Sequence, residues 1–199
     1  MEIYPSLYQG ELVRLTYIDP EKDAQIESGW THDPEYLRML DPDMAIPQSA
    51  FQIKKRYEKL EKEMDASGNQ FYFAVREKAS QEAESLGRLV GFARIYWIEW
   101  SHGSAMLSLG IGSPQDRGKG YGTETLQLIL RYAFDELNLF RLAVPVAQYN
   151  QVALGLFGKA GFVEEVRQRE ALERYGRRWD VVYLGLLRDE WNKSVKHEM

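Results

Sequence analysis

The residues best suited to chemistry lie in one glycine-rich turn near the middle of the chain. Gly118, Gly120 and Gly122 alternate there with Lys119 and follow Arg117. Glycines let the backbone approach a ligand closely, and the first N–H groups of a following helix have no partner inside it. With two cations beside them, these groups indicate a site for an anion such as phosphate. A glycine-rich turn with no ligand would show the same residues.

Two familiar phosphate-binding patterns do not fit this turn. The Walker pattern needs Ser or Thr after its lysine, but Gly120 follows Lys119. The dinucleotide fingerprint GxGxxG fails as well, because Thr123 or Thr125 stands where its third glycine belongs. The pattern that fits is Arg-x-x-Gly-x-Gly, which residues 117–122 satisfy as RGKGYG.

The turn connects a predicted strand to a predicted helix. Before it, Leu107, Leu109 and Ile111 alternate in a short apolar segment, as in a strand. After it, apolar residues recur with the spacing of one buried helical face. The residues of that face are Leu126, Ile129, Leu130, Ala133, Phe134 and Leu137.

The composition favours one domain and excludes several classes of site. The chain has 199 residues, of which 44% are hydrophobic, so a single domain spanning residues 1–199 is expected. The formal net charge of -5 argues against a nucleic-acid partner bound by neutralising phosphates. The absence of cysteine excludes disulfides, thiolate metal sites and a cysteine nucleophile.

Neither a metal nor a membrane partner is expected. The three histidines, His32, His102 and His197, are too scattered to indicate a metal site. No apolar run approaches membrane-spanning length, and the N-terminus lacks the basic and apolar parts of a signal peptide. These features predict a soluble cytoplasmic protein.

The N-terminal third is predicted to contain one strand and three helices. Asp19 and Asp33 are each followed by proline, which pairs an N-cap with a residue favoured at the first helical position. Pro47 is expected to open a longer helix that stops before Ser67-Gly68. The expected elements are a strand at 11–17 and helices at 20–30, 34–40 and 47–66.

The rest of the chain is predicted to supply most of the sheet. Pro145 cannot donate a ladder hydrogen bond, so strand pairing should be broken on one side of it. Gly161 is expected to cap a helix, and Tyr175-Gly176 to turn a final hairpin. The expected strands are 70–76, 87–100, 105–111, 139–147, 162–171 and 179–187, with a polar loop at 78–85, a helix at 150–160 and a terminal turn at 188–191.

Four motifs in order resemble the GNAT superfamily of acyl-CoA N-acyltransferases. The resemblance covers about Gln9 to Trp191 and is closest to the branch of ribosomal-protein N-terminal acetyltransferases and spermidine acetyltransferases. The segment RGKGYGTE, residues 117–124, is similar to the pyrophosphate loop of that family. The other three motifs are Arg14 with Asp23, Trp30 and Asp33-Pro34; Asn150 with Ala153 and Gly161-Phe162; and Tyr175-Gly176 with Trp179-Asp180 and Glu190-Trp191.

The resemblance implies a fold, an activity and a co-substrate. The fold would be α/β (α+β), a single GNAT-like domain whose mixed, mostly antiparallel sheet of six to seven strands carries helices on both faces. The activity would be transfer of an acetyl group from acetyl-CoA to a primary amine, without a metal. The residues implied in acetyl-CoA binding are Leu109, Gly110, Ile111, Arg117, Gly118, Lys119, Gly120, Tyr121, Gly122, Thr123, Asn150 and Phe157.

Such a transfer needs a proton acceptor and a hydrogen-bond donor. An alkyl amine with a pKa of about 10 is mostly protonated at neutral pH, so a base or a water relay must remove a proton. In the family, a backbone N–H of the strand before the loop donates to the carbonyl oxygen of the thioester, here around Leu109 to Ile111. The same strand pairs with pantetheine, where the fifth strand splays away near Pro145.

One position departs from the family pattern. Many GNAT enzymes carry a tyrosine late in the helix after the fifth strand as acid for the leaving thiolate. The matching residue here is Phe157, which has no proton to give. The thiolate is then expected to leave unassisted or to take a proton from solvent. The candidates for catalytic roles are Glu99, Ser108 and Asn150, with His102 and Asp180 as further candidate bases, and each has a structural or solvated role as its alternative.

The sequence does not identify the amine acceptor. An N-terminal amine, a lysine, a polyamine and an aminoglycoside all remain open. An acidic rim of Asp33, Asp41, Asp43 and Glu99 would favour a cationic acceptor. A homodimer is compatible with the sequence.

Two other functions compete with acetyl transfer. A non-catalytic domain that binds acyl-CoA as a sensor or partner module is kept open by Phe157. A phosphate- or nucleotide-binding protein is disfavoured, because the Walker lysine-serine pair and an acidic magnesium motif are both missing.

Overall fold

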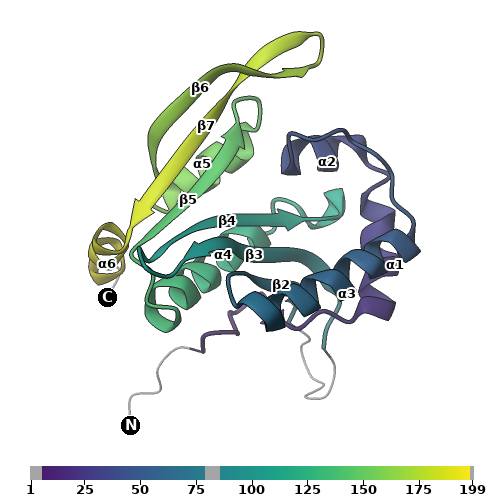
Figure 1. Cartoon of the computed structure of the whole chain (residues 1–199), viewed down its shortest axis with the longest axis horizontal. Coiled ribbons are helices and arrows are strands. Elements are labelled where there is room, and N and C mark those ends of the chain that lie inside the picture. Colours follow the sequence, from purple (N-terminus) through teal and green to yellow (C-terminus); the bar gives the residue numbers. More distant parts are fainter. Residues whose placement is uncertain (1–5, 79–85, 198–199) are drawn as a thin grey trace.

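A seven-stranded sheet forms the centre of the molecule. The computed structural model describes residues 6–78 and 86–197, and Figure 1 shows the sheet with its surrounding helices. The strand order is β1-β2-β3-β4-β5-β7-β6, and every neighbouring pair is antiparallel except β4 with β5. The strands are β1 Val13–Thr16, β2 Phe71–Glu77, β3 Leu89–Glu99, β4 Ser104–Ile111, β5 Arg141–Ala147, β6 Val163–Arg174 and β7 Arg177–Leu187. The predicted mixed, mostly antiparallel sheet is confirmed.

Three helices connect β1 to β2, and a polar side chain caps each of them. Asp19 and Asp33 accept hydrogen bonds from the first N–H groups of α1 (Pro20–Trp30) and α2 (Pro34–Leu40), as predicted. The predicted start of the third helix at Pro47 is wrong. Ser49 and the glutamine three residues later form a capping box, so α3 runs over Ala50–Ser67.

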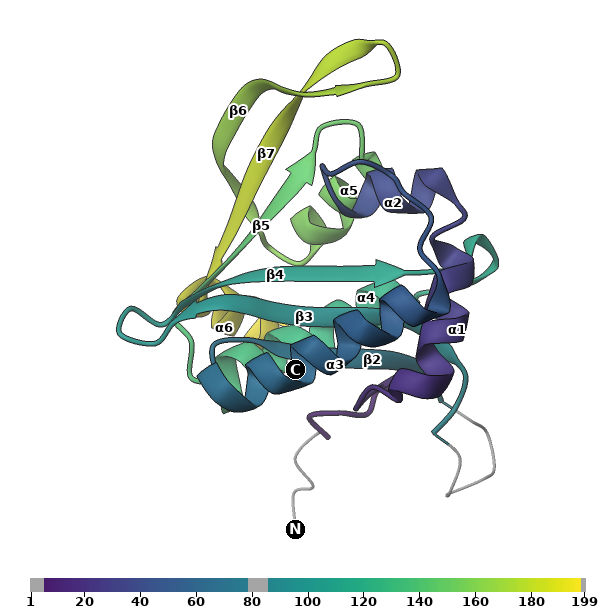
Figure 2. The ribbon, with the colours of Figure 1, turned by 45° about the vertical axis from the view of Figure 1, so that its right-hand side comes forward.

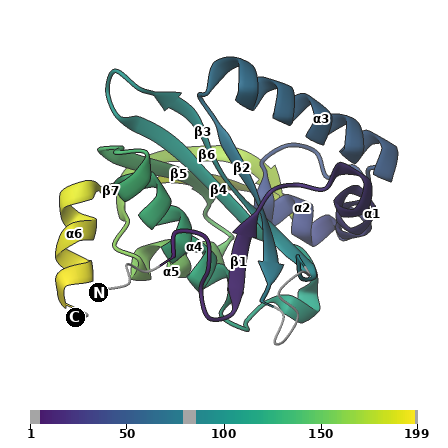
Figure 3. The same ribbon diagram turned by 90° about the horizontal axis from the view of Figure 1, so that it is seen from below.

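Helices cover both faces of the sheet, as Figure 3 shows. On one face α1 and α3 pack together through a small cluster that includes Ile53 and Tyr57. On the other face α4 (Tyr121–Arg131) and α5 (Gln151–Lys159) pack on the main core. The predicted apolar face of α4 is buried in that core, through Leu126, Ile129 and Leu130.

The strands β4 and β5 diverge, which leaves one edge of β4 open (Figure 2). Their parallel pairing joins only Ser104–Met106 to Arg141–Ala143. Beyond that point β4 continues against β3 and β5 continues against β7. The predicted break in pairing at Pro145 is therefore confirmed, and it lies on the side of β4.

Two segments near the core differ from their predicted form. The residues after the loop form α4 only as far as Arg131, and a π-helical turn follows at Tyr132–Glu136. The predicted terminal turn at 188–191 is instead the start of α6 (Arg188–His197). The ring of Trp191 lies 5.2 Å from that of Phe134, and this packing supports a helix that its sequence alone would not.

Two further expectations concern parts of the chain outside the core. Residues 79–85, most of the predicted polar loop, lie outside the described residues. No helix in the described part of the chain is both long and apolar enough to cross a membrane.

Candidate active site

The open edge of β4 presents backbone donors to the gap beside β5. Gly112 donates its N–H to the carbonyl of Val90 next to β3, at 3.0 Å. In an antiparallel pair the donors of one strand alternate between its two edges. The N–H groups of Leu109 and Ile111 therefore point away from β3 and into the gap, where the sequence places a donor to a thioester carbonyl.

Gly110 does not have the position that the resemblance implies. By the same alternation its N–H points toward β3, so it is not a donor in the gap. A Cβ at Gly110 would lie 3.0 Å from the ring of Phe92 and 3.1 Å from Leu40 of α2. The glycine therefore leaves room for α2 to pack on the sheet.

The glycine-rich turn leads into α4 without a capping side chain. Gly118 and Gly120 have φ angles of 76° and 90°, in the left-handed region that glycine adopts without strain. Gly120 is the N-cap of α4, and no side chain in the described part of the chain accepts a hydrogen bond at this helix start. The N–H groups of Tyr121, Gly122 and Thr123 lack intrahelical partners and are available to an anion.

The two cations of the turn are partly exposed and lie beside carboxylates. Arg117 donates to the carbonyl of Gly112 at 2.8 Å and to Asp33 at 3.2 Å. The ammonium group of Lys119 lies 3.4 Å from Asp116. Both residues come within three positions of the N-cap Gly120, and each carboxylate offsets part of the positive charge that a phosphate there would meet.

An ion pair between buried Asp116 and half-exposed Arg88 holds the turn, and no local pattern in the sequence indicates it. Asp116 lies in the 3-10 turn Pro114–Asp116 and accepts two hydrogen bonds from Arg88, at 2.6 and 2.9 Å. These bonds lower the pKa of the Asp116 carboxyl below its ordinary value of 3.8. Because Arg88 directly precedes β3, the pair ties the loop to the sheet through a long-range contact.

The side chain of Tyr121 is turned into the core, so the contact with acetyl-CoA that the resemblance implies could come only from its backbone. Its ring lies in the main core at 6% exposure, and its hydroxyl donates to Glu77. Only the backbone N–H of Tyr121 is available at the helix start.

Glu124, the glutamate that follows the loop, anchors the first strand. Its carboxylate accepts hydrogen bonds from the N–H groups of Glu11, Leu12 and Val13, at 2.7, 2.8 and 2.7 Å. The contact joins α4 to the start of β1, so Glu124 does more than complement the helix dipole.

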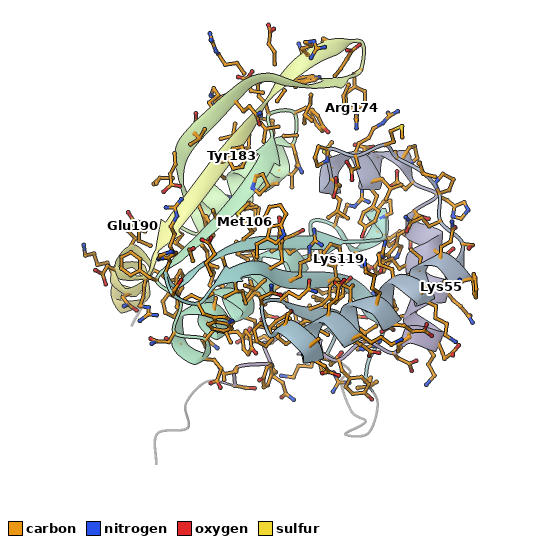
Figure 4. The ribbon with its side chains drawn as sticks, viewed as in Figure 1. Lys55, Met106, Lys119, Arg174, Tyr183 and Glu190 are labelled. Atoms are coloured by element: carbon orange, nitrogen blue, oxygen red, sulfur yellow. The ribbon has the colours of Figure 1, made fainter. Side chains whose placement is uncertain are left out.

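Two adjoining cavities lie beside β4. The larger has a volume of about 740 Å³ and is bordered by β3, β4, β5, β7, α2 and α5. The smaller has a volume of about 570 Å³ and lies among α1, α2, α3 and β3. Figure 4 shows Met106 and Tyr183, which line the larger cavity, at the opening between β4 and β7. The two cavities share Leu40, Asp41, Asp43, Leu60, Arg94 and Ser108.

Of the predicted catalytic residues, Ser108 lines both cavities and Glu99 lines neither. Glu99 lies at the turn between β3 and β4, where it accepts a hydrogen bond from the hydroxyl of Ser104 at 2.8 Å. At that end β4 and β5 are still paired, so the position of Glu99 contradicts its predicted role as base. His102 and Asp180 also lie outside both cavities.

The predicted acidic rim is present only in part. Asp41 and Asp43 border both cavities. Asp33 instead holds Arg117, and Glu99 lies at the far turn. Because Arg94 also borders both cavities, the lining carries both signs of charge.

Asn150 caps α5 and also bridges to α2. Its Oδ1 accepts a hydrogen bond from the N–H of Ala153 at 3.0 Å, and its Nδ2 donates to the carbonyl of Met39 at 3.0 Å. Its side chain lines the larger cavity. Asn150 therefore has the predicted capping role, together with a contact across the cavity that the sequence did not reveal.

Further contacts close the larger cavity on the α2 side. Tyr149 donates its hydroxyl to the carbonyl of Arg38 at 2.6 Å. Arg174, labelled in Figure 4, reaches from the end of β6 and donates to the carbonyl of Asp43 at 2.8 Å. The segment from α2 to Asp43 is thus held over the cavity by hydrogen bonds to its backbone.

Phe157 lies on the wall of the larger cavity. It is 4% exposed, and its ring is 5.2 Å from that of Phe162. The predicted position of Phe157 beside the cleft agrees with this placement, and the side chain offers no proton there.

The sequence model of the acetyltransferase (GNAT) domain matches residues 13–163. The chain belongs to the GNAT acetyltransferase family. It is an acetyl-CoA-dependent N-acetyltransferase, as the resemblance implied, and the non-catalytic alternative finds no support among the similar proteins.

Two curated proteins illustrate the likeness of this GNAT enzyme to others. The prophage-derived, uncharacterized N-acetyltransferase YokL of Bacillus subtilis is 28% identical over 185 residues, which cover 92% of this chain and 94% of that protein. The spermidine N(1)-acetyltransferase of Vibrio cholerae is 33% identical over 107 residues, 53% of this chain and 61% of that protein.

A solved structure shows the same fold. The spermidine N-acetyltransferase from Vibrio cholerae, in complex with CoA and spermine, matches with a TM-score of 0.76 at 22% identity. The match covers 92% of this chain and 99% of that one.

Proposed function

We propose that this GNAT enzyme acetylates a small primary amine held in the two cavities, with acetyl-CoA bound between β4 and β5. The supporting observation is the early end of the β4–β5 pairing, which leaves the N–H groups of Leu109 and Ile111 facing the gap. The uncapped N-terminus of α4 follows at the end of the same strand, where residues 117–123 would hold the pyrophosphate.

The proposed chemistry is direct attack of the amine on the thioester. The amine nitrogen forms a bond to the carbonyl carbon, and the bond from that carbon to sulfur breaks. The N–H of Leu109 or Ile111 donates to the oxygen as negative charge develops on it. The sulfur leaves as a thiolate and takes its proton from solvent, because Phe157 has none to give.

The amine must lose one proton during the transfer. Glu99 borders neither cavity, and the hydroxyl of Ser108 is not itself a base at neutral pH. Of the carboxylates that border the two cavities, Glu27 is paired with Arg56 and Glu63 with Lys59, so the proton passes through water toward Asp41 and Asp43. Ser108 orients that water or the amine from β4.

A panel assay of CoA release tests the proposal. Thiol release from acetyl-CoA is followed with primary amines of different charge, and the N-acetyl products are identified by mass spectrometry. We expect at least one amine to accelerate release well above hydrolysis. Calorimetric binding of acetyl-CoA without acceleration by any amine would favour the non-catalytic module instead.

The branch of the family, the cellular location and the oligomeric state of this enzyme are also proposals. Relatives named as spermidine and putative ribosomal acetyltransferases support the branch that the motifs indicate. A cytoplasmic location is proposed because the co-substrate is a cytoplasmic metabolite. One spermidine acetyltransferase of this fold is described as dodecameric. For this chain we propose a homodimer, which light scattering on the purified protein would test.

A further inference from the structure

Arg94 borders both cavities and forms no ion pair with a carboxylate in the described part of the chain. The Nε of Arg94 is buried and has no hydrogen-bond partner among the described residues. Its guanidinium lies over the ring of Tyr96, with the central carbon 4.4 Å from the ring centroid. A buried donor without an acceptor is destabilising, and more so when it is charged. The arrangement therefore indicates a ligand that supplies the missing acceptor.

Arg94 also lies beside the reacting groups. In the register of β3 with β4 it stands directly opposite Ser108, and paired residues of this kind have Cα atoms about 5.5 Å apart. Ser108 immediately precedes Leu109, whose N–H faces the gap. The guanidinium of Arg94 reaches over Tyr96, which pairs with Met106, so a group held by Arg94 would lie beside the Met106–Ser108 stretch of β4, next to Leu109.

The cavities also carry carboxylates, which would bind a positively charged group of the same ligand. Asp41 and Asp43 border the same space as Arg94. Glu27 is already held by Arg56 and the hydroxyl of Tyr57, so it does not neutralise Arg94. A molecule with both an ammonium and a carboxylate matches this mixed lining, whereas a polyamine would bring an ammonium against the guanidinium.

We propose that Arg94 selects an acceptor that carries a carboxylate next to its amine, a free amino acid. The planar guanidinium fork binds a carboxylate through two parallel hydrogen bonds, which fixes the position of the neighbouring amine. The inference rests on the proposed function, because it is acetyl transfer at β4 that places the amine there. The hydroxyl of Tyr36 borders the smaller cavity, is buried and has no hydrogen-bond partner among residues 6–78 and 86–197, so it is a second donor available to a polar acceptor.

Pairs of acceptors that differ only in the carboxylate separate its contribution to acetylation from that of the amine. Free amino acids and their carboxamides are compared as acceptors for the wild type and for Arg94→Gln. The ratio of kcat/KM for acid over amide is compared between the two proteins, so that differences in amine pKa cancel. We expect Arg94→Gln to lower kcat/KM for the acid about tenfold or more, mainly through KM, and to change that for the amide less than about threefold.

Two further variants control for charge and shape. Arg169→Gln removes one positive charge from an exposed position on β6 that borders neither cavity. It should leave the ratio unchanged. Arg94→Lys keeps the charge without the fork and should restore only part of the preference for the acid. Thermal melts confirm that each variant is folded.

The outcomes distinguish this inference from the proposed function. Acetylation confined to amines without an acid group, or an equal loss for acid and amide in Arg94→Gln, would overturn the role of Arg94 and leave acetyl transfer intact. Failure of acetyl-CoA to bind, or of every amine to be acetylated, would overturn the proposed function and this inference with it.

Discussion

Gly122 is the residue of the loop at which binding and folding can be separated. A Cβ there would make ordinary contacts, 3.8 Å from Ile111 at the end of β4 and 3.9 Å from Leu156 on α5. A larger side chain would extend into the gap proposed for acetyl-CoA. We expect Gly122→Val to weaken acetyl-CoA binding about tenfold or more, since overpacking costs about 1–3 kcal/mol. Calorimetric titration measures the affinity, and a thermal melt should move by only about 3 °C.

A substitution at Gly120 would not separate acetyl-CoA binding from folding as clearly. From the sequence, Gly120→Val is expected to abolish binding with little loss of fold. The structure contradicts the second half, because the φ angle of Gly120 is 90° and an added Cβ would lie 3.0 Å from Leu12. A β-branched residue there costs about 1–3 kcal/mol in strain.

Gly122→Ala is the matched control for Gly122→Val and should weaken binding less. Unchanged affinity in folded Gly122→Val would remove the loop from the proposed site.

Asp116 gives the loop a pH-dependent support. Its pKa is lowered by the hydrogen bonds from Arg88, so its stabilising effect is complete above its ordinary value of 3.8 and is lost as the pH falls below that value. We expect Asp116→Asn to lower the free energy of unfolding by about 1–3 kcal/mol at neutral pH and to raise the Kd for acetyl-CoA. Urea unfolding at several pH values should show the two proteins converging as the pH falls below 3.8. A difference that does not depend on pH would contradict the ion pair.

At the scale of elements, Asn150 couples α5 to α2. Replacing it by alanine removes both the helix cap and the hydrogen bond to the carbonyl of Met39. We expect Asn150→Ala to lower the free energy of unfolding by about 0.5–2 kcal/mol. The KM for the amine should rise as well, because α2 is then held less firmly over the larger cavity.

Asn150→Ser separates the two roles of this residue. Serine is a good N-cap, so most of the stability should return. Its short hydroxyl does not reach α2 as the amide does, so the KM for the amine should stay raised. Full recovery of both properties in Asn150→Ser would show that the bridge to Met39 has no part in acceptor binding.

Elements with local signals were predicted closely, and those that depend on distant contacts were not. Asp19 and Asp33 mark the starts of α1 and α2 because capping involves neighbouring residues only. The start of α3 was predicted wrongly, because a proline favours the first helical position but the capping box at Ser49 sets the start. The length of α6 depends on packing of Trp191 against Phe134, which no local pattern shows.

At the scale of the whole molecule, the sequence revealed one half of the site better than the other. The loop residues 117–122 are contiguous, so their spacing alone indicates an anion site. The acceptor cavity joins β3, β4 and α2 with α3, so its composition depends on the sheet register and on helix packing. For this reason the sequence alone does not identify Arg94 as a cavity residue, and it indicates Glu99 as a catalytic candidate although Glu99 lies outside the cavities.

The charge of the cavity also depends on residues that only the fold brings together, and it differs from the acidic rim that the sequence predicts. A net charge of -5 and four carboxylates suggested an acidic rim. Net charge is spread over the whole surface, whereas the charge that an acceptor meets is set by the few side chains on the cavity. There Asp41 and Asp43 are opposed by Arg94.

Hydrogen exchange of backbone amides, with and without acetyl-CoA, tests the location of the site most directly. In the free protein the amides of Leu109 and Ile111 face the gap without a strand partner, and those of residues 121–123 lie at an uncapped helix start. We expect acetyl-CoA to slow exchange in these two segments, while Ser104 and Met106, which pair with both β3 and β5, change little. Bound acetyl-CoA that leaves exchange at Leu109, Ile111 and residues 121–123 unaltered would contradict the proposed site.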